Sequence, residues 1–194
     1  MEEEKKNRNP LRDAPGYEIC FLPTDRRREY LMGLWNSRTE RPELEMIYVN
    51  LAEDRIWFAD GTMRLLLHTT RRLQTGEYRY GCFEPGKGWL AEGEHLHLER
   101  ILISEGGDRK AKTFWLWVYD DSGGNGIYRH RLYDSRNRMI GSFTSLRSAR
   151  EPYEEIEYQK TNDYLVFREK KAGRLLLKKY IIDNEEEQNE KDWK

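Results

Sequence analysis

The feature that most constrains this chain is the recurrence of short strand-like segments separated by turn residues. Segments rich in β-branched and aromatic residues recur roughly every 8–15 residues, and several of them alternate apolar with polar residues. Short runs typical of turns divide them, for example Asp60-Gly61 and the run at residues 85–88 (PGKG). The pattern predicts strands at residues 43–49, 55–59, 62–70, 77–83, 89–103, 112–119, 127–133, 139–143, 155–159, 163–168 and 174–182. Such a series is typical of an all-β sandwich or barrel.

Helical signals are few and short. Residues 24–32 (TDRRREYLM) are expected to form a short helix capped by Thr24 or Asp25, and residues 145–151 a second short helix or turn. Residues 1–16 lack periodicity and contain several charges, so we interpret them as a mobile N-terminal tail. Residues 183–194 have the same character and are acidic. We therefore predict one β-domain at residues 17–182 between two tails.

Composition narrows the class of protein. No stretch approaches the roughly 18 consecutive apolar residues that a membrane-spanning helix needs, and no apolar segment follows the charged N-terminus. Charged residues make up 36% of the chain, which favours disorder, but aromatic residues make up 12%, which favours a packed core. The formal net charge is -1, with -4 in residues 183–194 and +3 in residues 17–182. This near-neutral balance does not indicate general binding to polyanions.

The chain has two cysteines, Cys20 and Cys82, which is too few for a disulfide framework. Because no secretion signal is recognised, we expect a reducing, cytoplasmic location in which both are buried thiols. A single bridge between them stays open as the alternative.

Two motifs near the ends of the predicted domain resemble those of the lipocalin family and the wider calycin superfamily. Gly33 and Trp35 form a Gly-x-Trp motif after the predicted helical turn, and residues 161–164 (TNDY) match a later Thr-Asp-Tyr motif if Asn162 is an insertion. The resemblance implies a β-barrel whose floor is closed by the ring of Trp35. It also implies a basic residue stacked on that ring, for which Arg174, Lys178 and Lys179 are eligible.

From the strand pattern and this resemblance, we predict a single closed antiparallel β-barrel of about 8–10 strands, with a β-sandwich as the alternative. An eight-stranded barrel is wide enough to hold one small ligand or to be filled by side chains. The missing secretion signal makes an intracellular lipocalin-like protein the best match.

The segment at residues 114–119 (FWLWVY) is apolar on both faces of its predicted strand. In a barrel, one face, either that of Trp115 and Trp117 or that of Phe114, points inward, and the other needs a cover. The functional interpretation is an aromatic-lined pocket or a dimer surface. The structural interpretation is a central strand covered by residues 17–22.

Arg129 and Arg131 alternate along a predicted strand and therefore share a face. Guanidinium groups at a barrel mouth bind carboxylates, phosphates or a nucleic-acid backbone, and the neighbouring Tyr128 and Tyr133 are able to stack on bases. The alternative is a solvated face paired with nearby acids, which is the commoner role of a run of charges.

Signals for catalysis or metal binding are weak. His95 and His97 share a strand face with Glu99, but two histidines do not make a metal site, so we interpret them as solvent-facing. The sequence contains no nucleophile elbow, phosphate-binding glycine loop or zinc-type cysteine pattern. We therefore predict no catalytic residue, no metal and no cofactor.

The first functional hypothesis is a non-catalytic binding protein for a small, partly apolar ligand, with an anionic group as an option, held inside the barrel. Tyr80, Trp115 and Trp117 are predicted to form the wall, and Arg129 and Arg131 to anchor the anion. The alternatives are a protein-interaction module that uses the aromatic strand or the Arg-rich face, including a homodimer, and an enzyme on a calycin scaffold. We expect no membrane partner, and a nucleic-acid partner is disfavoured.

Overall fold

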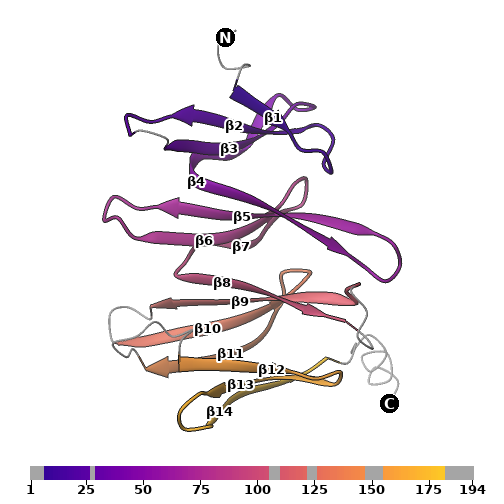
Figure 1. Cartoon of the computed structure of the whole chain (residues 1–194), viewed down its shortest axis with the longest axis vertical. Helices are drawn as coiled ribbons and strands as arrows, with labels where there is room; N and C mark the ends of the chain where they lie inside the picture. Colours follow the sequence, from indigo (N-terminus) through magenta and orange to yellow (C-terminus); the bar gives the residue numbers. More distant parts are fainter. Residues whose placement is uncertain (1–6, 27–28, 105–109, 122–125, 147–154, 182–194) are drawn as a thin grey trace, which may run out of the picture.

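The computed structural model describes residues 7–26, 29–104, 110–121, 126–146 and 155–181, and the elements in this part of the chain are all β-strands (Figure 1). This confirms the all-β prediction. The strands are β1 (Arg8–Pro10), β2 (Tyr17–Pro23), β3 (Tyr30–Asn36), β4 (Arg41–Trp57), β5 (Met63–Arg72), β6 (Tyr78–Glu84), β7 (Gly88–His95), β8 (His97–Ile103), β9 (Thr113–Asp121), β10 (Ile127–Asp134), β11 (Met139–Leu146), β12 (Ile156–Lys160), β13 (Tyr164–Glu169) and β14 (Leu175–Tyr180).

The strands form three open antiparallel sheets, so the predicted closed barrel is wrong. Strands β1 to β7 make one sheet, β8 to β11 a second and β12 to β14 a third, and within each sheet every strand pairs with its neighbours in the chain. A closed barrel requires the first and last strands of a sheet to pair with each other. In the described part of the chain, this pairing is absent from all three sheets. The arrangement is closer to the β-sandwich alternative, because the sheets pack on one another through their faces.

The predicted helix at residues 24–32 is also wrong, because this segment contains the turn of the β2–β3 hairpin and the start of β3. The Thr24 hydroxyl accepts a hydrogen bond from the Arg26 amide at 3.2 Å, and the Thr24 amide donates to the Glu29 carbonyl at 3.1 Å. Leu31 then pairs with Leu22 across the hairpin. Pairing with an apolar strand outweighs a helical propensity that extends over only two turns. Of the second predicted helix, Ser145 and Leu146 belong to β11, and its remaining residues, 147–151, lie outside the described residues.

The predicted N-terminal tail is partly a structural element. Arg8–Pro10 forms the edge strand β1, which pairs with β2, and the Leu11 side chain is buried in a core cluster. The proline-containing loop between β1 and β2 is held by a hydrogen bond from the Leu11 amide to the Tyr17 carbonyl at 2.8 Å. The predicted acidic tail at residues 183–194 lies outside the described residues.

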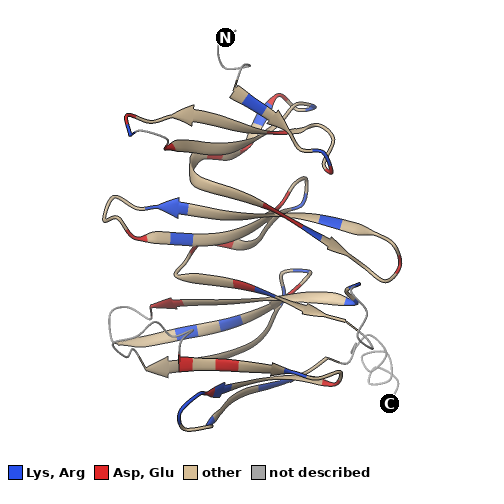
Figure 2. Cartoon of the chain, in the orientation of Figure 1, with Lys and Arg blue, Asp and Glu red and all other residues tan. Residues whose placement is uncertain are grey.

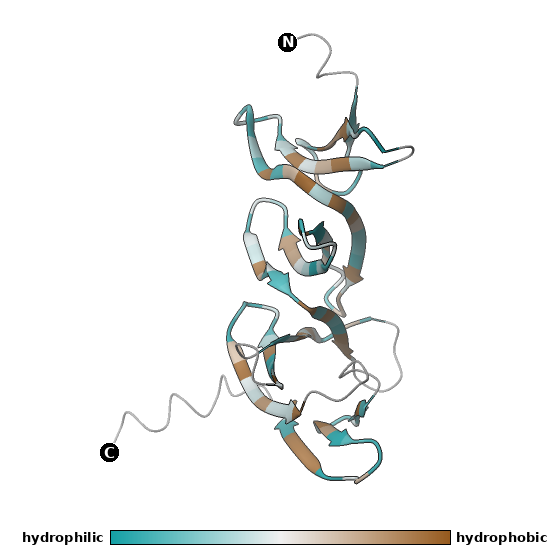
Figure 3. Cartoon of the chain, turned by 90° about the vertical axis from the view of Figure 1, so that its left-hand side faces the viewer, coloured by the Kyte–Doolittle hydropathy of each residue, from teal (hydrophilic) through white to brown (hydrophobic). Residues whose placement is uncertain are grey.

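The long strand β4 divides the seven-stranded sheet into two layers, because it runs from one layer into the next. Its residues before Tyr48 pair with β3, and its residues after Tyr48 pair with β5, so the two halves belong to different groups of strands. Figures 1 and 3 show this long strand descending from the first group to the second. The described residues thus form a stack of four layers: layer 1 (β1–β3 with residues 41–48 of β4), layer 2 (residues 48–57 of β4 with β5–β7), layer 3 (β8–β11) and layer 4 (β12–β14).

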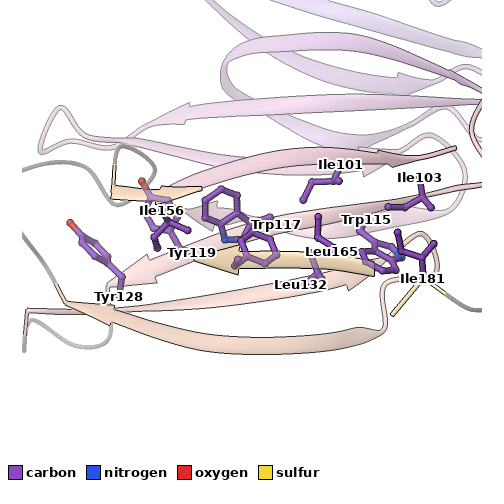
Figure 4. Close-up of a cluster of buried hydrophobic side chains, with 11 residues drawn as sticks. Ile101, Ile103, Trp115, Trp117, Tyr119, Tyr128, Leu132, Ile156, Leu165 and Ile181 are labelled. Atoms are coloured by element: carbon purple, nitrogen blue, oxygen red, sulfur yellow. The ribbon is translucent and has the colours of Figure 1, made fainter. Parts of the chain in front are cut away.

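A core cluster fills each space between successive layers. The first core lies between layers 1 and 2 and contains Leu34 and Leu67; the second lies between layers 2 and 3 and contains Leu66 and Leu116. The third core lies between layers 3 and 4, where Figure 4 shows aromatic rings of β9 packed against aliphatic side chains such as Leu165. Burial of apolar area on both faces of layers 2 and 3 is therefore the main stabilising contribution in this part of the chain.

This layering explains the strand that is apolar on both faces. Phe114, Leu116 and Val118 of β9 point into the second core, whereas Trp115 and Trp117 point into the third. Layers 2 and 4 of the same chain cover the two faces, rather than a second copy or residues 17–22. Residues 17–22 belong to layer 1, on the far side of layer 2.

Ion pairs border the second core. Arg64 binds the Glu84 carboxylate and also donates to the Ser135 carbonyl at 2.9 Å, which ties layer 2 to the β10–β11 turn of layer 3. On β9, the Asp120 carboxylate accepts from Arg131 at 3.0 Å and contacts the His95 ring at 2.9 Å. These contacts satisfy charged groups where the apolar interface meets water.

Candidate functional site

The outer face of layer 1 is the feature most suited to binding. Strand β2 directs Ile19 and Phe21 into the first core, so Cys20 and Leu22 point to the opposite side. The antiparallel register places Gly33 opposite Cys20 and Trp35 opposite Glu18, and these residues share that outer face. In the described part of the chain, no further layer covers it (Figure 3).

This face contains a groove of about 670 Å³, which is within the range of about 300–1,000 Å³ that is typical of small-molecule sites. Its lining comes from four strands and from the residue before β1: Asn7, Arg8, Cys20, Phe21, Leu22, Gly33, Leu34, Trp35, Pro42, Leu44, Glu45 and Met46. Most of these side chains are apolar. Leu22 and Met46 are 46% and 38% exposed, so a bound ligand would remove substantial apolar surface from water.

Gly33 is required for the floor of the groove. A Cβ atom at this position would lie 2.7 Å from the Leu44 carbonyl oxygen and 2.9 Å from Cγ of Met46. The first contact is with backbone, so any larger residue would push β4 away from β3. The Gly-x-Trp motif therefore has a packing role at its glycine and a surface role at its tryptophan. Trp35 belongs to none of the three core clusters and does not close a barrel.

Arg8 and Trp35 form the polar end of the groove. The Arg8 guanidinium lies 4.3 Å from the centre of the Trp35 ring, a cation–π contact. Arg8 is thus the basic residue on this ring, rather than Arg174, Lys178 or Lys179. Its Nη1 is 3.6 Å from the Glu18 carboxylate, and its buried Nε has no hydrogen-bond partner in the described part of the chain. A buried donor without a partner is costly, which favours an acceptor on a ligand.

The five residues that the sequence predicts for ligand binding lie elsewhere, and none of them lines this groove. Trp115 and Trp117 are 6% and 2% exposed in the third core. Tyr80 lies on β6 opposite His95, in layer 2. Arg131 is bound to Asp120, and Arg129 is exposed on the same strand. The structure does not bring these residues together around one cavity, and their role in binding stays a prediction.

A buried histidine organises the third core. His130 is fully buried and stacks on Phe143 at a centroid distance of 4.4 Å. The Trp117 Nε1–H donates to His130 Nδ1 at 3.2 Å, so the proton of the neutral ring lies on Nε2, which donates to the Ser145 hydroxyl at 2.8 Å. Burial and the nearby His97 lower the pKa of His130 to about 3. This fully bonded neutral ring is suited to packing rather than to proton transfer at neutral pH.

The expected common solvent face of His95 and His97 is wrong. The chain bends at Leu96, so the two rings belong to different strands. His95 is buried beside Asp120, and His97 stacks on Tyr119 at a centroid distance of 5.2 Å. Among the described residues, no group of three or more His, Cys, Asp or Glu side chains is placed to hold a metal ion.

The sequence carries only a weak signal for the residues that line the groove. Residues 17–22 (YEICFL) have apolar side chains on both strand faces, which indicates either an inner layer or an exposed binding face. Arg8 had no signal at all, because its role depends on pairing between β1 and β2.

Comparison with known proteins found no match among protein-family models, curated proteins or solved structures. None of the described elements is a helix long and apolar enough to cross a membrane.

Proposed function

We propose that this protein is a non-catalytic binding protein and that the groove of layer 1 holds a small, partly apolar ligand with an anionic group. The observation that carries the proposal is the groove itself, which combines a ligand-sized volume with an apolar lining and Arg8 at one end. The apolar part of the ligand packs on Trp35, Leu22 and Met46. Its anionic group accepts a hydrogen bond from the Arg8 guanidinium, which lines the groove.

Arg8 gives the proposed site its selectivity for charge. Glu18 is 3.6 Å from the guanidinium, too far for a hydrogen bond, and the second acid of the lining, Glu45, is exposed to water on β4. A ligand anion that reaches Arg8 therefore gains a charge-assisted hydrogen bond, worth about 1.5–3 kcal/mol. This corresponds to roughly 10–100-fold in affinity.

Two fluorescent probes with related aromatic ring systems test the proposal. Anilinonaphthalene sulfonate carries an anionic group, and phenylnaphthylamine lacks it. We expect both probes to bind the intact protein, and we expect Arg8→Gln to weaken the sulfonate by roughly 10–100-fold while changing the neutral probe less than about twofold. Leu22→Asn is expected to weaken both probes, because it removes apolar contact area.

Arg129→Gln and Arg131→Gln are the matched controls, since they remove the same charge from the residues that the sequence predicts as anion anchors. The proposal predicts that neither changes the binding of either probe. A loss of sulfonate binding in these variants, with none in Arg8→Gln, would refute the groove as the site. Light scattering gives a second check: a stable dimer that excludes both probes and dissociates in Leu22→Asn would assign this face to a second copy instead.

A further inference from the structure

The outer face of layer 4, at the opposite end of the stack, is a basic and aromatic surface distinct from the groove. Leu165 and Phe167 of β13 point into the third core, so Tyr164 and Arg168 point outward. On β14, Tyr180 pairs with Tyr164, which places it on the same outer face together with Lys178. Sheet faces that contain exposed tyrosines and cations are suited to anionic partners.

Two tyrosine rings hold one cation of this face, Lys178, in position. The Lys178 ammonium group lies 4.3 Å from the centre of the Tyr164 ring and 5.0 Å from that of Tyr180. Lys170 and Lys171 follow in the exposed β13–β14 turn, where Figure 2 shows a concentration of basic residues. Residues 155–181 contain seven Lys and Arg against four Asp and Glu, a net charge of +3.

Two acids reduce this basic character locally. Glu157 on β12 lies directly opposite Arg168 in the strand register, and Glu169 forms an ion pair with Arg174 in the turn. Among the residues that the structure describes, Lys178 contacts two tyrosine rings rather than a carboxylate. The excess positive charge is therefore concentrated on β14 and the turn before it.

The sequence that follows this face has the complementary charge. Residues 183–194 (DNEEEQNEKDWK) carry six acids and two lysines, a net charge of -4, and they include Trp193. They begin two residues after Ile181, whose amide donates to the Asp163 carbonyl at 2.8 Å and so fixes the end of layer 4.

We propose that the acidic segment 183–194 binds the outer face of layer 4 in the same molecule and covers its basic surface. Residues 182–194 span up to about 45 Å when extended, roughly twice the length of the six-residue strand β14, so the segment is able to reach all of this face. The acidic run Glu185–Glu187 pairs with Lys178 and the turn lysines. Because the segment is tethered, its effective concentration is in the millimolar range, so even weak ion pairs hold it in place.

Zero-length carbodiimide cross-linking of the full chain tests this contact, with peptide mapping at low salt and at high salt. We expect bonds from Glu185, Glu186 or Glu187 to Lys178, Lys170 or Lys171, reduced several-fold at high salt because exposed ion pairs are screened. Lys87, exposed on the β6–β7 turn of layer 2, is the internal control and is expected to react little with the segment. Equal reaction with Lys87 would overturn the proposal. In a mixture of nitrogen-15-labelled and unlabelled protein, cross-links of mixed mass would also overturn it, by showing that the segment binds a second copy.

Heparin binding provides a second test with a charge-matched control. Changing Glu185, Glu186 and Glu187 together to Gln removes three negative charges beside layer 4, whereas the same change at Glu2, Glu3 and Glu4 removes three at the other end of the chain. Uncovering the basic face predicts a several-fold gain in heparin affinity for the first variant only. Equal gains would show that net charge alone controls binding and would refute the cover. Neither result depends on whether the groove of layer 1 binds a ligand.

Discussion

Leu116 offers the sharpest test of the claim that layer 3 is buried on both faces. Its side chain is fully buried in the second core, where β9 contacts layer 2. In a barrel or sandwich with one wet face, one of the two faces of β9 would meet water. In the four-layer stack, Leu116→Ala removes contacts with layer 2 and leaves a cavity between two packed sheets.

The magnitude follows from this burial. Replacing a buried Leu by Ala costs about 2–5 kcal/mol, because lost transfer free energy adds to the cost of the cavity. Leu146 lies in the same sheet but is 73% exposed, so Leu146→Ala removes the same atoms from a site in contact with water. We expect Leu146→Ala to change the free energy of unfolding by at most about 0.5 kcal/mol. A loss of several kcal/mol is a large share of the roughly 5–15 kcal/mol typical of a domain.

Urea unfolding at 25 °C measures both variants against the parent chain. Far-UV circular dichroism and tryptophan fluorescence are recorded together, since coincident curves are needed for a two-state treatment. The reasoning predicts a clear fall in the midpoint for Leu116→Ala and almost none for Leu146→Ala. Equal, small shifts in the two variants would show that layer 2 does not cover this face of β9.

Three further predictions concern polar groups in and around the cores. Burial and the nearby His97 lower the pKa of His130 from 6.5 to about 3, so between these pH values the unfolded chain binds a proton that the folded chain excludes. The contribution of this ring to the free energy of unfolding is therefore fully present above pH 6.5 and is lost as the pH falls toward 3. His130→Gln is expected to reduce the slope of stability against pH in that range by up to about 1.4 kcal/mol per pH unit, as measured by urea titrations at several pH values. Tyr158→Phe removes the 2.8 Å hydrogen bond from the tyrosine hydroxyl to the Glu99 carboxylate and is expected to lower the free energy of unfolding by about 1.5–3 kcal/mol in the same assay. An unchanged free energy of unfolding would contradict this hydrogen bond between layers 3 and 4. Arg64→Met leaves the buried Glu84 carboxylate without its main partner and is expected to lower the free energy of unfolding by about 3–5 kcal/mol. The double variant Arg64→Met with Glu84→Gln is expected to recover part of this stability, because it also removes the buried charge.

Local sequence patterns were sufficient to predict most strands but not whether the sheets are open or closed. The Asp60-Gly61 turn correctly predicts the β4–β5 hairpin, because φ at Gly61 is +84° and only glycine adopts that conformation readily. Alternation along each strand says nothing about whether the first and last strands of a sheet pair. The change of pairing partner at Tyr48, which divides β4 between two layers, has no local signal either.

The sequence carries evidence for a multilayered stack in strands that are apolar on both faces, although such a strand alone is equally compatible with a pocket wall, a dimer surface or a covered central strand. Residues 114–119 are apolar on both faces, and Leu65, Leu66 and Leu67 of β5 are all buried. Two such strands indicate two inner layers, which a single barrel does not contain. The binding residues were harder to predict, because Arg8 and Trp35 are 27 positions apart and meet only through the β1–β2–β3 register.

The reactivity of Cys20 tests the central claim, that the groove of layer 1 is a binding site, most directly. Cys20 lines the groove and is half-buried, whereas Cys82 is fully buried and its pKa is raised to about 12 by burial and by the nearby Asp54 carboxylate. In the folded protein, iodoacetamide is therefore expected to label Cys20 and to spare Cys82, which serves as an internal reference for folding. The account predicts that saturating anilinonaphthalene sulfonate slows the labelling of Cys20 several-fold, as measured by intact mass. An unchanged rate at saturating probe would contradict it.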